Sequence, residues 1–276
     1  MRLRSLLFVP GDRPDRMEKA LGLGADALIL DLEDSVAASR KAEAREAVIA
    51  LLTRAERSLP LLVRINPIDG PEANEDLAAL REAHPDGLVL PKAEGAATIH
   101  ALSSWTGAPI LPIATETPAA LFELGTYREV ADRLLGLTWG AEDLPAAIGA
   151  TAAREADGRY TAPIETARSL ALFAAHAAGV PAIETVYPDF RNLDGLAAYA
   201  ARGARDGFTG MMAIHPDQIA VINRAFTPTE AEIVAARAIV DAFAANPDAG
   251  VLAVDGKMVD APHLVQARRV LERAQS

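Results

Sequence analysis

The chain has 276 residues, 50% of them hydrophobic, and a formal net charge of −11 at pH 7. This length and apolar content allow one large core, as in an α/β barrel, or two small domains. The negative charge argues against a nucleic-acid partner, because phosphate binding needs clustered Lys and Arg. The chain has no cysteine, which excludes disulfides, thiolate catalysis and zinc–thiolate sites.

The first ten residues contain a short apolar run that is followed by Pro10-Gly11-Asp12. A secretory signal has a longer apolar region and a small-residue cleavage site, so we interpret this segment as the first strand of the fold. No apolar stretch approaches the length needed to cross a membrane. We therefore expect a soluble, cytoplasmic protein without a membrane partner.

Short apolar runs alternate with longer stretches of mixed polarity, which is typical of a parallel sheet with crossover helices. Eight strands favour a (β/α)8 TIM barrel over a doubly wound sheet, which usually has fewer strands at this length. The predicted strands are Leu6–Val9, Ala27–Leu32, Leu61–Ile65, Leu88–Leu90, Ile110–Thr115, Leu134–Trp139, Val180–Val186 and Phe208–Ile214.

Helical stretches separate the predicted strands. The last of them is expected to start at Thr227, with this residue as N-cap and Pro228 in the first helical position. The predicted helices are Pro14–Gly22, Ala38–Arg57, Glu72–Ala83, Ala96–Trp105, one from Pro118, Asp143–Ile148, Ile164–Ala178, Leu193–Ala204 and one that ends near Ala245.

Residues 1–248 complete the predicted barrel, and residues 249–276 have no position in it. Val251–Val254, a turn at Asp255-Gly256, Lys257–Asp260 and a helix from Pro262 form a C-terminal arm. An additional arm of this kind commonly packs on a neighbouring subunit, so we expect residues 249–276 at a subunit interface.

Four of the predicted strands end on charged residues. The carboxyl ends of parallel strands meet on one face of a barrel, where the active sites of this fold lie. We therefore expect a ring of ionisable side chains on that face, formed by Asp31, Glu33, Asp34, Arg64, Glu116, Glu142 and Asp143.

Glu116 and Asp143 follow adjacent strands, so we expect their carboxylates to lie close together. Two bare carboxylates repel each other, and a shared cation removes that cost. Without thiols or paired histidines, a hard ion such as Mg²⁺ fits best and leaves positions open for water and substrate oxygens. The alternative is that both residues cap the helices that follow them, where carboxylates are favoured.

Arg64 ends an otherwise apolar strand, and its guanidinium suits bidentate binding of a substrate carboxylate. A structural ion pair with Asp31 or Glu33 is an equally open interpretation. Asp31, Glu33 and Asp34 are expected to support the metal site or to pair with Arg64. Lys92, also at a strand end, is expected to support the same site. Its use as a Schiff-base nucleophile is the second choice, because a metal makes that route unnecessary.

Eight stretches carry a resemblance that covers nearly the whole chain: Arg4–Gly11, Leu30–Val36, Val63–Asn66, Leu90–Lys92, Gly140–Leu144, Glu184–Tyr187, Ile214–Pro216 and Asp255–Asp260. Taken in order, they resemble the citrate lyase β-subunit and malyl-CoA lyase family of the larger HpcH/HpaI aldolase group. They are most similar to the stand-alone CitE-like proteins. The resemblance implies a Mg²⁺-dependent barrel that cleaves or forms a C–C bond between an acyl-thioester enolate and a 2-keto acid.

The resemblance also implies roles for particular residues. Glu116 and Asp143 would hold the Mg²⁺. Arg64 would bind the keto acid, together with backbone N–H groups around Ala141, Glu142 and Asp143.

Further residues are implied outside this centre. Asp260, on the arm, resembles the family's acid/base residue and would reach the active site of the next subunit in a homotrimer or hexamer. Arg13, Lys19 and Lys41 would contact CoA phosphates. Met211 is a departure, because family members often carry Lys at this position, and its replacement removes a cation.

The expected function is therefore a lyase that acts on citryl-CoA, citramalyl-CoA or malyl-CoA and yields an acyl-CoA such as acetyl-CoA and a 2-keto acid. Three alternatives stay open. The chain would be a citrate lyase β-subunit that needs an acyl-carrier protein, a free-acid class II aldolase, or a metal- and CoA-binding regulator without turnover.

Overall fold

The computed structural model describes residues 1–54 and 57–275. Its contacts divide the chain into two compact units, one of Leu3–Asn223 and a smaller one that joins Met1–Arg2 to the chain from Arg224 onward. The sequence-based boundary after residue 248 differs from this division, because the contacts assign helix α10 (Glu230–Ala245) to the smaller unit.

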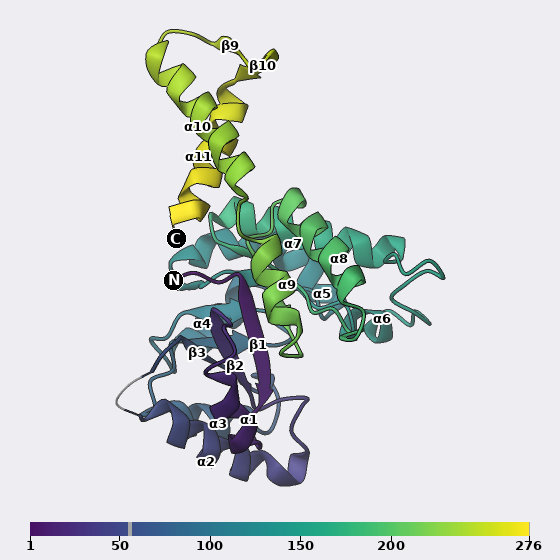
Figure 1. Cartoon of the computed structure of the whole chain (residues 1–276). Coiled ribbons are helices and arrows are strands. Elements are labelled where there is room, and N and C mark those ends of the chain that lie inside the picture. Colours follow the sequence, from purple (N-terminus) through teal and green to yellow (C-terminus); the bar gives the residue numbers. More distant parts are fainter. Residues whose placement is uncertain (55–56, 276) are drawn as a thin grey trace. The chain divides into compact units, whose positions relative to one another are not determined.

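The larger unit is a (β/α)8 barrel, as the sequence predicts. Its strands pair in parallel in the order β5-β4-β3-β2-β1-β8-β7-β6, and β1, β2 and β3 are labelled in Figure 1. Parallel bridges Ile110↔Leu134 and Ile113↔Thr138 join the two ends of this order and close the ring. The strands are β1 (Ser5–Pro10), β2 (Ala27–Asp31), β3 (Leu61–Arg64), β4 (Gly87–Leu90), β5 (Ile110–Pro112), β6 (Leu137–Thr138), β7 (Ala182–Glu184) and β8 (Gly210–Ala213).

Helices follow the strands in the predicted alternation. The predicted helix Ala38–Arg57 begins as a 3₁₀ turn and its α-helical part ends at Leu52; residues 55–56 lie outside the described part of the chain. The barrel helices are α1 (Pro14–Ala20), η1 (Ala38–Arg40), α2 (Lys41–Leu52), α3 (Ala73–Leu80), α4 (Gly95–Ser103), α5 (Pro118–Glu123), η2 (Leu124–Arg133), α6 (Asp143–Ala147), α7 (Ala162–Ala178), α8 (Leu193–Asp206) and α9 (Gln218–Ala225).

Helix α9 is the element that the sequence analysis missed. It follows β8 directly, where the prediction placed the next helix only after Thr227. Its buried side chains are those of Gln218, Ile219 and Ile222. A polar residue at the first of these positions obscures the apolar stripe of an eight-residue helix.

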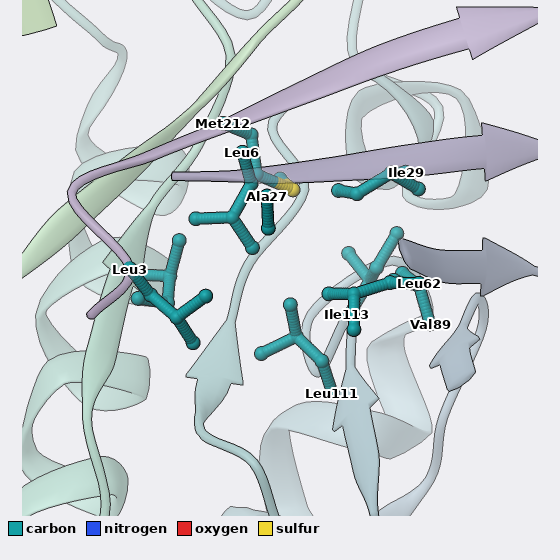
Figure 2. Packing of buried hydrophobic residues seen from close by; sticks show 10 residues of the cluster. Leu3, Leu6, Ala27, Ile29, Leu62, Val89, Leu111, Ile113 and Met212 are labelled. Carbon is teal, nitrogen blue, oxygen red and sulfur yellow. The ribbon is translucent and has the colours of Figure 1, made fainter. Parts of the chain in front are cut away.

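The barrel interior is filled by apolar side chains that come from many strands. Figure 2 shows this cluster, in which Leu6, Ile29, Leu62 and Val89 belong to four successive strands. Each of these four is 0% exposed. Since apolar side chains fill the interior, the ionisable groups of the barrel lie at the strand ends, where water and ligands have access. The full cluster is Leu3, Leu6, Ala27, Ile29, Leu62, Val89, Leu111, Ile113, Ile183 and Met212.

The smaller unit contains the predicted arm. Helix α10 starts at a capping box in which Thr229 is the N-cap and Glu232 its partner, so the predicted N-cap at Thr227 is wrong by two residues. Strands β9 (Val251–Val254) and β10 (Lys257–Asp260) form an antiparallel hairpin that leads into α11 (Ala261–Gln275).

The hairpin turn is made by Asp255 and Gly256, whose φ values are 48° and 73°. Positive φ at both central residues favours an Asp-Gly pair, as the sequence predicts for this turn. Over the described residues, no helix is both long enough and apolar enough to span a bilayer.

Candidate active site

Asp31 and Arg64 form a bidentate ion pair at the carboxyl ends of β2 and β3. The two residues are register partners in the sheet, which places their side chains next to each other. Arg64 donates from Nε to Asp31 Oδ1 and from Nη2 to Oδ2, both at 2.6 Å. Burial raises the pKa of the Asp31 carboxyl, but the hydrogen bonds and the charge of Arg64 lower it by more, so the net shift of the pKa is downward. The structural ion pair that the sequence left open is therefore present.

The other edge of the Arg64 guanidinium faces Glu33. Its Nη1 lies 2.9 Å from Glu33 Oε2, and its plane lies over the ring of Phe8, 4.8 Å from the centroid. Asp34 is more remote, at 3.9 Å, with a side chain that is 67% exposed. Because Asp31 occupies Nε and Nη2, a substrate carboxylate would meet Arg64 at Nη1, which it would share with Glu33.

Glu116 is a buried carboxylate that follows β5. It is 6% exposed, and its Oε2 accepts the Lys92 backbone N–H at 2.6 Å. It does not cap the next helix, because the N-cap of α5 is Thr117, whose side chain accepts the N–H of Ala120. The capping alternative therefore fails for Glu116.

Asp143 is the first residue of α6 and follows β6. Its side chain is 37% exposed, and Oδ1 lies 3.4 Å from Lys92 Nζ. The preceding residues differ from each other in burial: Ala141 is 1% exposed, whereas Glu142 is an exposed N-cap residue whose side chain makes no capping bond.

Lys92 lies among the carboxylates at the ends of β2, β5 and β6. Burial lowers the pKa of its amine, but Glu33, Glu116 and Asp143 raise it more, so the net shift is upward. A lysine that stays protonated is a poor nucleophile for a Schiff base, which requires the neutral amine. This environment disfavours the Schiff-base alternative and agrees with a supporting role for Lys92.

The donor set fits a hard divalent cation. Within residues 1–54 and 57–275, no group of three or more His, Asp or Glu side chains is arranged to hold a metal. An ion here would have two protein carboxylates, Glu116 and Asp143, with water and substrate oxygens in its other positions, which is typical of Mg²⁺. The buried Glu116 carboxyl is costly to ionise without a partner, and a divalent cation would offset this cost.

Glu116 is expected to make metal binding depend on pH. Burial is the main cause that raises its pKa to about 7, from 4.5, and the charges of Asp143 and Glu33 add to it. Mg²⁺ binds the ionised form, so its apparent dissociation constant should rise about tenfold per unit as the pH falls below about 7. Calorimetric titration from about pH 6 to about pH 8 checks this, and an affinity that is constant over the range contradicts it.

The same shift affects the stability of the metal-free protein. The folded state binds this proton more tightly than the unfolded state does, so between the unfolded value near 4.5 and about 7 the free energy of unfolding decreases as the pH rises.

Gly140 leaves the room that Glu116 needs. A Cβ on Gly140 would lie 2.8 Å from Glu116 Cγ and 3.0 Å from Oε1. Thr115 holds this glycine in place, since its Oγ1 donates to Gly140 O at 3.0 Å and accepts from Gly140 N at 3.1 Å. The sequence analysis singled out neither residue for this role.

Gly140→Ala is therefore expected to displace the Glu116 carboxylate and to lower turnover about 100-fold. Gly125→Ala is the matched control, because a Cβ there meets nothing within 4 Å. Comparison of Mg²⁺ affinity and turnover for the two variants tests this, and equal values for both would show that Gly140 has no such role.

A second group that sequence reasoning missed lies at the end of β7. Glu184, 0% exposed, accepts from Trp139 Nε1 at 2.6 Å and from Arg168 Nε at 2.9 Å. Trp139 directly precedes Gly140, so this buried pair fixes the start of the segment that carries Asp143. Glu184 ends an apolar strand as Asp31 does, and this signal was available in the sequence.

The three predicted CoA contacts lie in different environments. Lys41 is 9% exposed, and its Nζ donates to Leu32 O at 2.6 Å, Glu33 O at 2.8 Å and Asn66 Oδ1 at 2.8 Å. These bonds fix the backbone at Leu32 and Glu33, and because they occupy the Lys41 ammonium they argue against a phosphate contact by this residue. Arg13 lies 3.5 Å from Asp15, and Lys19 is exposed on α1; their CoA roles stay predictions.

Asp260 and Met211 complete the comparison with the sequence. Asp260 ends β10 in the smaller unit, and its Oδ1 lies 2.5 Å from Nδ1 of His263. Its acid/base role stays a prediction.

Met211 is 0% exposed within β8, so the departure from the usual Lys changes a buried position and not a surface contact for a carrier.

The carboxyl ends of the strands bring together four carboxylates (Asp31, Glu33, Glu116 and Asp143), Arg64 and Lys92, which is the place and the kind of residue set that an active site has in an α/β barrel. The family model described as HpcH/HpaI aldolase/citrate lyase matches residues 4–216. The chain therefore belongs to the HpcH/HpaI aldolase/citrate lyase family, and this membership supports a lyase activity.

Individual relatives cover nearly the full length. A "(3S)-malyl-CoA thioesterase" of Cereibacter sphaeroides is 35% identical over 280 residues, which are 99% of this chain and 95% of the relative. A "citrate lyase subunit beta-like protein" of Mycobacterium tuberculosis is 38% identical over 268 residues, 97% and 94% of the two chains. The structure of CitE from the same organism with magnesium, acetoacetate and coenzyme A superimposes with a TM-score of 0.87, at 35% identity and with 100% and 99% coverage.

Proposed function

We propose that this chain is a Mg²⁺-dependent carbon–carbon lyase for a 3-hydroxy-3-carboxyacyl thioester such as citryl-CoA, citramalyl-CoA or malyl-CoA. Cleavage yields an acyl-CoA such as acetyl-CoA and a 2-keto acid, and the reverse direction joins them. The observation that carries the proposal is that Glu116 and Asp143 both contact Lys92 on the barrel end that also presents Arg64. The magnesium, acetoacetate and coenzyme A in the related CitE structure support it.

Glu116 and Asp143 are the residues that would hold the Mg²⁺. When bound, the ion supplies Lewis-acid polarisation of the keto-acid carbonyl oxygen. The protein's part is to present two carboxylates and to leave the remaining positions to oxygen atoms of substrate and water.

Arg64 binds the carboxylate of the keto-acid half through Nη1, because Asp31 fixes the opposite edge of the guanidinium. Glu33 lies on this side of Arg64. Burial is the main cause that raises the pKa of Glu33, and its carboxyl also lies 3.3 Å from the Lys92 ammonium, which offsets its repulsion of an incoming carboxylate. The backbone N–H groups of Ala141, Glu142 and Asp143 are proposed to bind the same acid.

Asp260 is proposed as the acid/base residue, from a neighbouring subunit. In cleavage, Asp260 takes the proton of the 3-hydroxyl and the C2–C3 bond breaks. C3 becomes the keto carbonyl, and the electron pair leaves on C2 as the thioester enolate, which takes a proton to give the acyl-CoA. The hydrogen bond with His263 lowers the pKa of Asp260, which keeps it ionised and ready to accept the proton.

The test is to incubate the purified protein with Mg²⁺ and each of the three thioesters. The keto acid and the free CoA thiol are measured in parallel; the chain has no cysteine and adds no thiol background. A lyase releases keto acid without thiol, and Glu116→Ala or Asp143→Ala should abolish the release. No keto acid from any of the thioesters would refute the proposal.

A second candidate is hydrolysis of the thioester, favoured by the relative called (3S)-malyl-CoA thioesterase. In the same assay this activity releases thiol and a hydroxy acid but no keto acid. Dependence on an acyl-carrier protein, one of the alternatives left open by the sequence, is recognised by activity that begins only when the carrier is added. Sedimentation of the full chain tests the expected homotrimer or hexamer.

A further inference from the structure

Lys92 contacts three carboxylates that come from three different strand ends. Its backbone N–H donates to Glu116 Oε2 at 2.6 Å. Its Nζ lies 3.3 Å from Glu33 Oε1 and 3.4 Å from Asp143 Oδ1. Within the described part of the chain, it is the one residue that pairs with both Glu116 and Asp143.

The backbone of Lys92 has the left-handed conformation, with φ of 50°. Residues other than Gly, Asn and Asp rarely adopt it, and it persists where the surroundings enforce it, often at functional sites. Here it allows one residue to direct its N–H to Glu116 and its side chain to Glu33 and Asp143. The backbone conformation and the three carboxylate contacts thus occur at the same residue.

The charge of Lys92 has a consequence for metal binding. Its ammonium neutralises Asp143 and Glu33, which otherwise repel each other and Glu116. A divalent cation that bound Glu116 and Asp143 would lie within a few ångströms of this ammonium, and like charges at such a distance repel strongly. The ammonium and the metal therefore compete for Asp143.

We propose that Lys92 is the resident counter-ion of the metal site. It holds Glu116 and Asp143 in place while the site has no metal, and its ammonium leaves Asp143 and stays with Glu33 when Mg²⁺ binds. Lys92 is thus a positioning residue that makes the site ordered but weaker for Mg²⁺ than the carboxylates alone would be. This inference rests on the metal-binding role proposed for Glu116 and Asp143.

Lys92→Met keeps the backbone N–H and an unbranched side chain, one atom shorter than lysine, but removes the charge. It should tighten the Mg²⁺ dissociation constant, measured by calorimetry without substrate, by about tenfold or more. Lys92→Arg keeps the charge and should remain close to the wild type. Arg81→Met is the matched control, because it removes a positive charge at the end of α3, at the opposite end of the barrel. A loss of packing alone would not increase the affinity for Mg²⁺. The direction of the change in Mg²⁺ affinity therefore distinguishes a positioning role of Lys92 from a purely structural one.

The wild-type protein provides a second measurement that does not depend on how well the variant folds. The chain has four lysines, so the Nζ signals in a ¹⁵N spectrum are few and can be assigned. The Lys92 signal should shift when Mg²⁺ is added, while those of Lys19 and Lys257 stay in place. Equal or weaker Mg²⁺ binding by Lys92→Met, or a Lys92 signal that does not respond, would overturn the inference. If the wild-type protein bound no Mg²⁺, or if Glu116→Gln left its Mg²⁺ binding unchanged, the proposed function itself would be refuted.

Discussion

Glu116→Gln is expected to abolish Mg²⁺ binding and turnover while it makes the protein more stable. The amide keeps the shape and can still accept the Lys92 N–H, but it cannot supply the anionic ligand. Burial raises the pKa of Glu116 to about 7, so at pH 8 the folded protein carries the cost of a buried charge. Removal of that charge should increase the free energy of unfolding of the metal-free protein, on the order of 2 kcal/mol.

Two measurements check this result: calorimetric titration with Mg²⁺, and thermal unfolding at pH 8 with a chelator present. Glu123→Gln is the control, because Glu123 is exposed on α5 and lies outside the site. If Glu116→Gln bound Mg²⁺ as the wild type does, Glu116 would not be a ligand. If it lost binding and stability together, the cause would be misfolding and not the removal of a ligand.

Arg64→Met is expected to abolish keto-acid binding and to lower the free energy of unfolding by several kcal/mol. It leaves Asp31, which is 1% exposed, without its cationic partner. Removal of one member of a buried pair costs roughly 3–5 kcal/mol. The pKa of Asp31 is lowered in the folded state, so this contribution is present above the ordinary value near 3.8 and is lost as the pH falls through the folded value.

The double variant Asp31→Asn/Arg64→Met separates the two effects. The asparagine side chain keeps the shape of the aspartate and avoids the unpaired charge, so we expect most of the stability to return. Keto-acid binding should stay absent, because it depends on the guanidinium itself. Chemical denaturation and pyruvate binding in the presence of Mg²⁺ measure the two quantities. Full binding by Arg64→Met would remove Arg64 from the proposed site.

The strand-end pattern was enough to predict the barrel and the face on which its ionisable groups gather. Buried strands such as β2 and β3 are short apolar runs in the sequence, and Asp31 and Arg64 stand out because each interrupts such a run. Parallel strands carry residues at equivalent positions to the same end, so the proximity of these groups follows from the fold class alone.

Other features depend on geometry that residue order does not specify. Lys41 begins α2, where a lysine is usually solvated, and its burial depends on carbonyls of Leu32 and Glu33 that turn toward it. The left-handed backbone of Lys92 has no local signal such as glycine or asparagine. Arg168, within an Ala-rich helix, is recognised as part of the site's support only when α7 is packed against Glu184.

The central claim is that Glu116 and Asp143 share one divalent ion. The most direct measurement is the anomalous scattering of Mn²⁺ in crystals grown with this ion in place of Mg²⁺. The account predicts one strong peak roughly 2.1 Å from a carboxylate oxygen of each residue, with water or keto-acid oxygens in the other positions. A peak elsewhere, or one that contacts neither Glu116 nor Asp143, would contradict it.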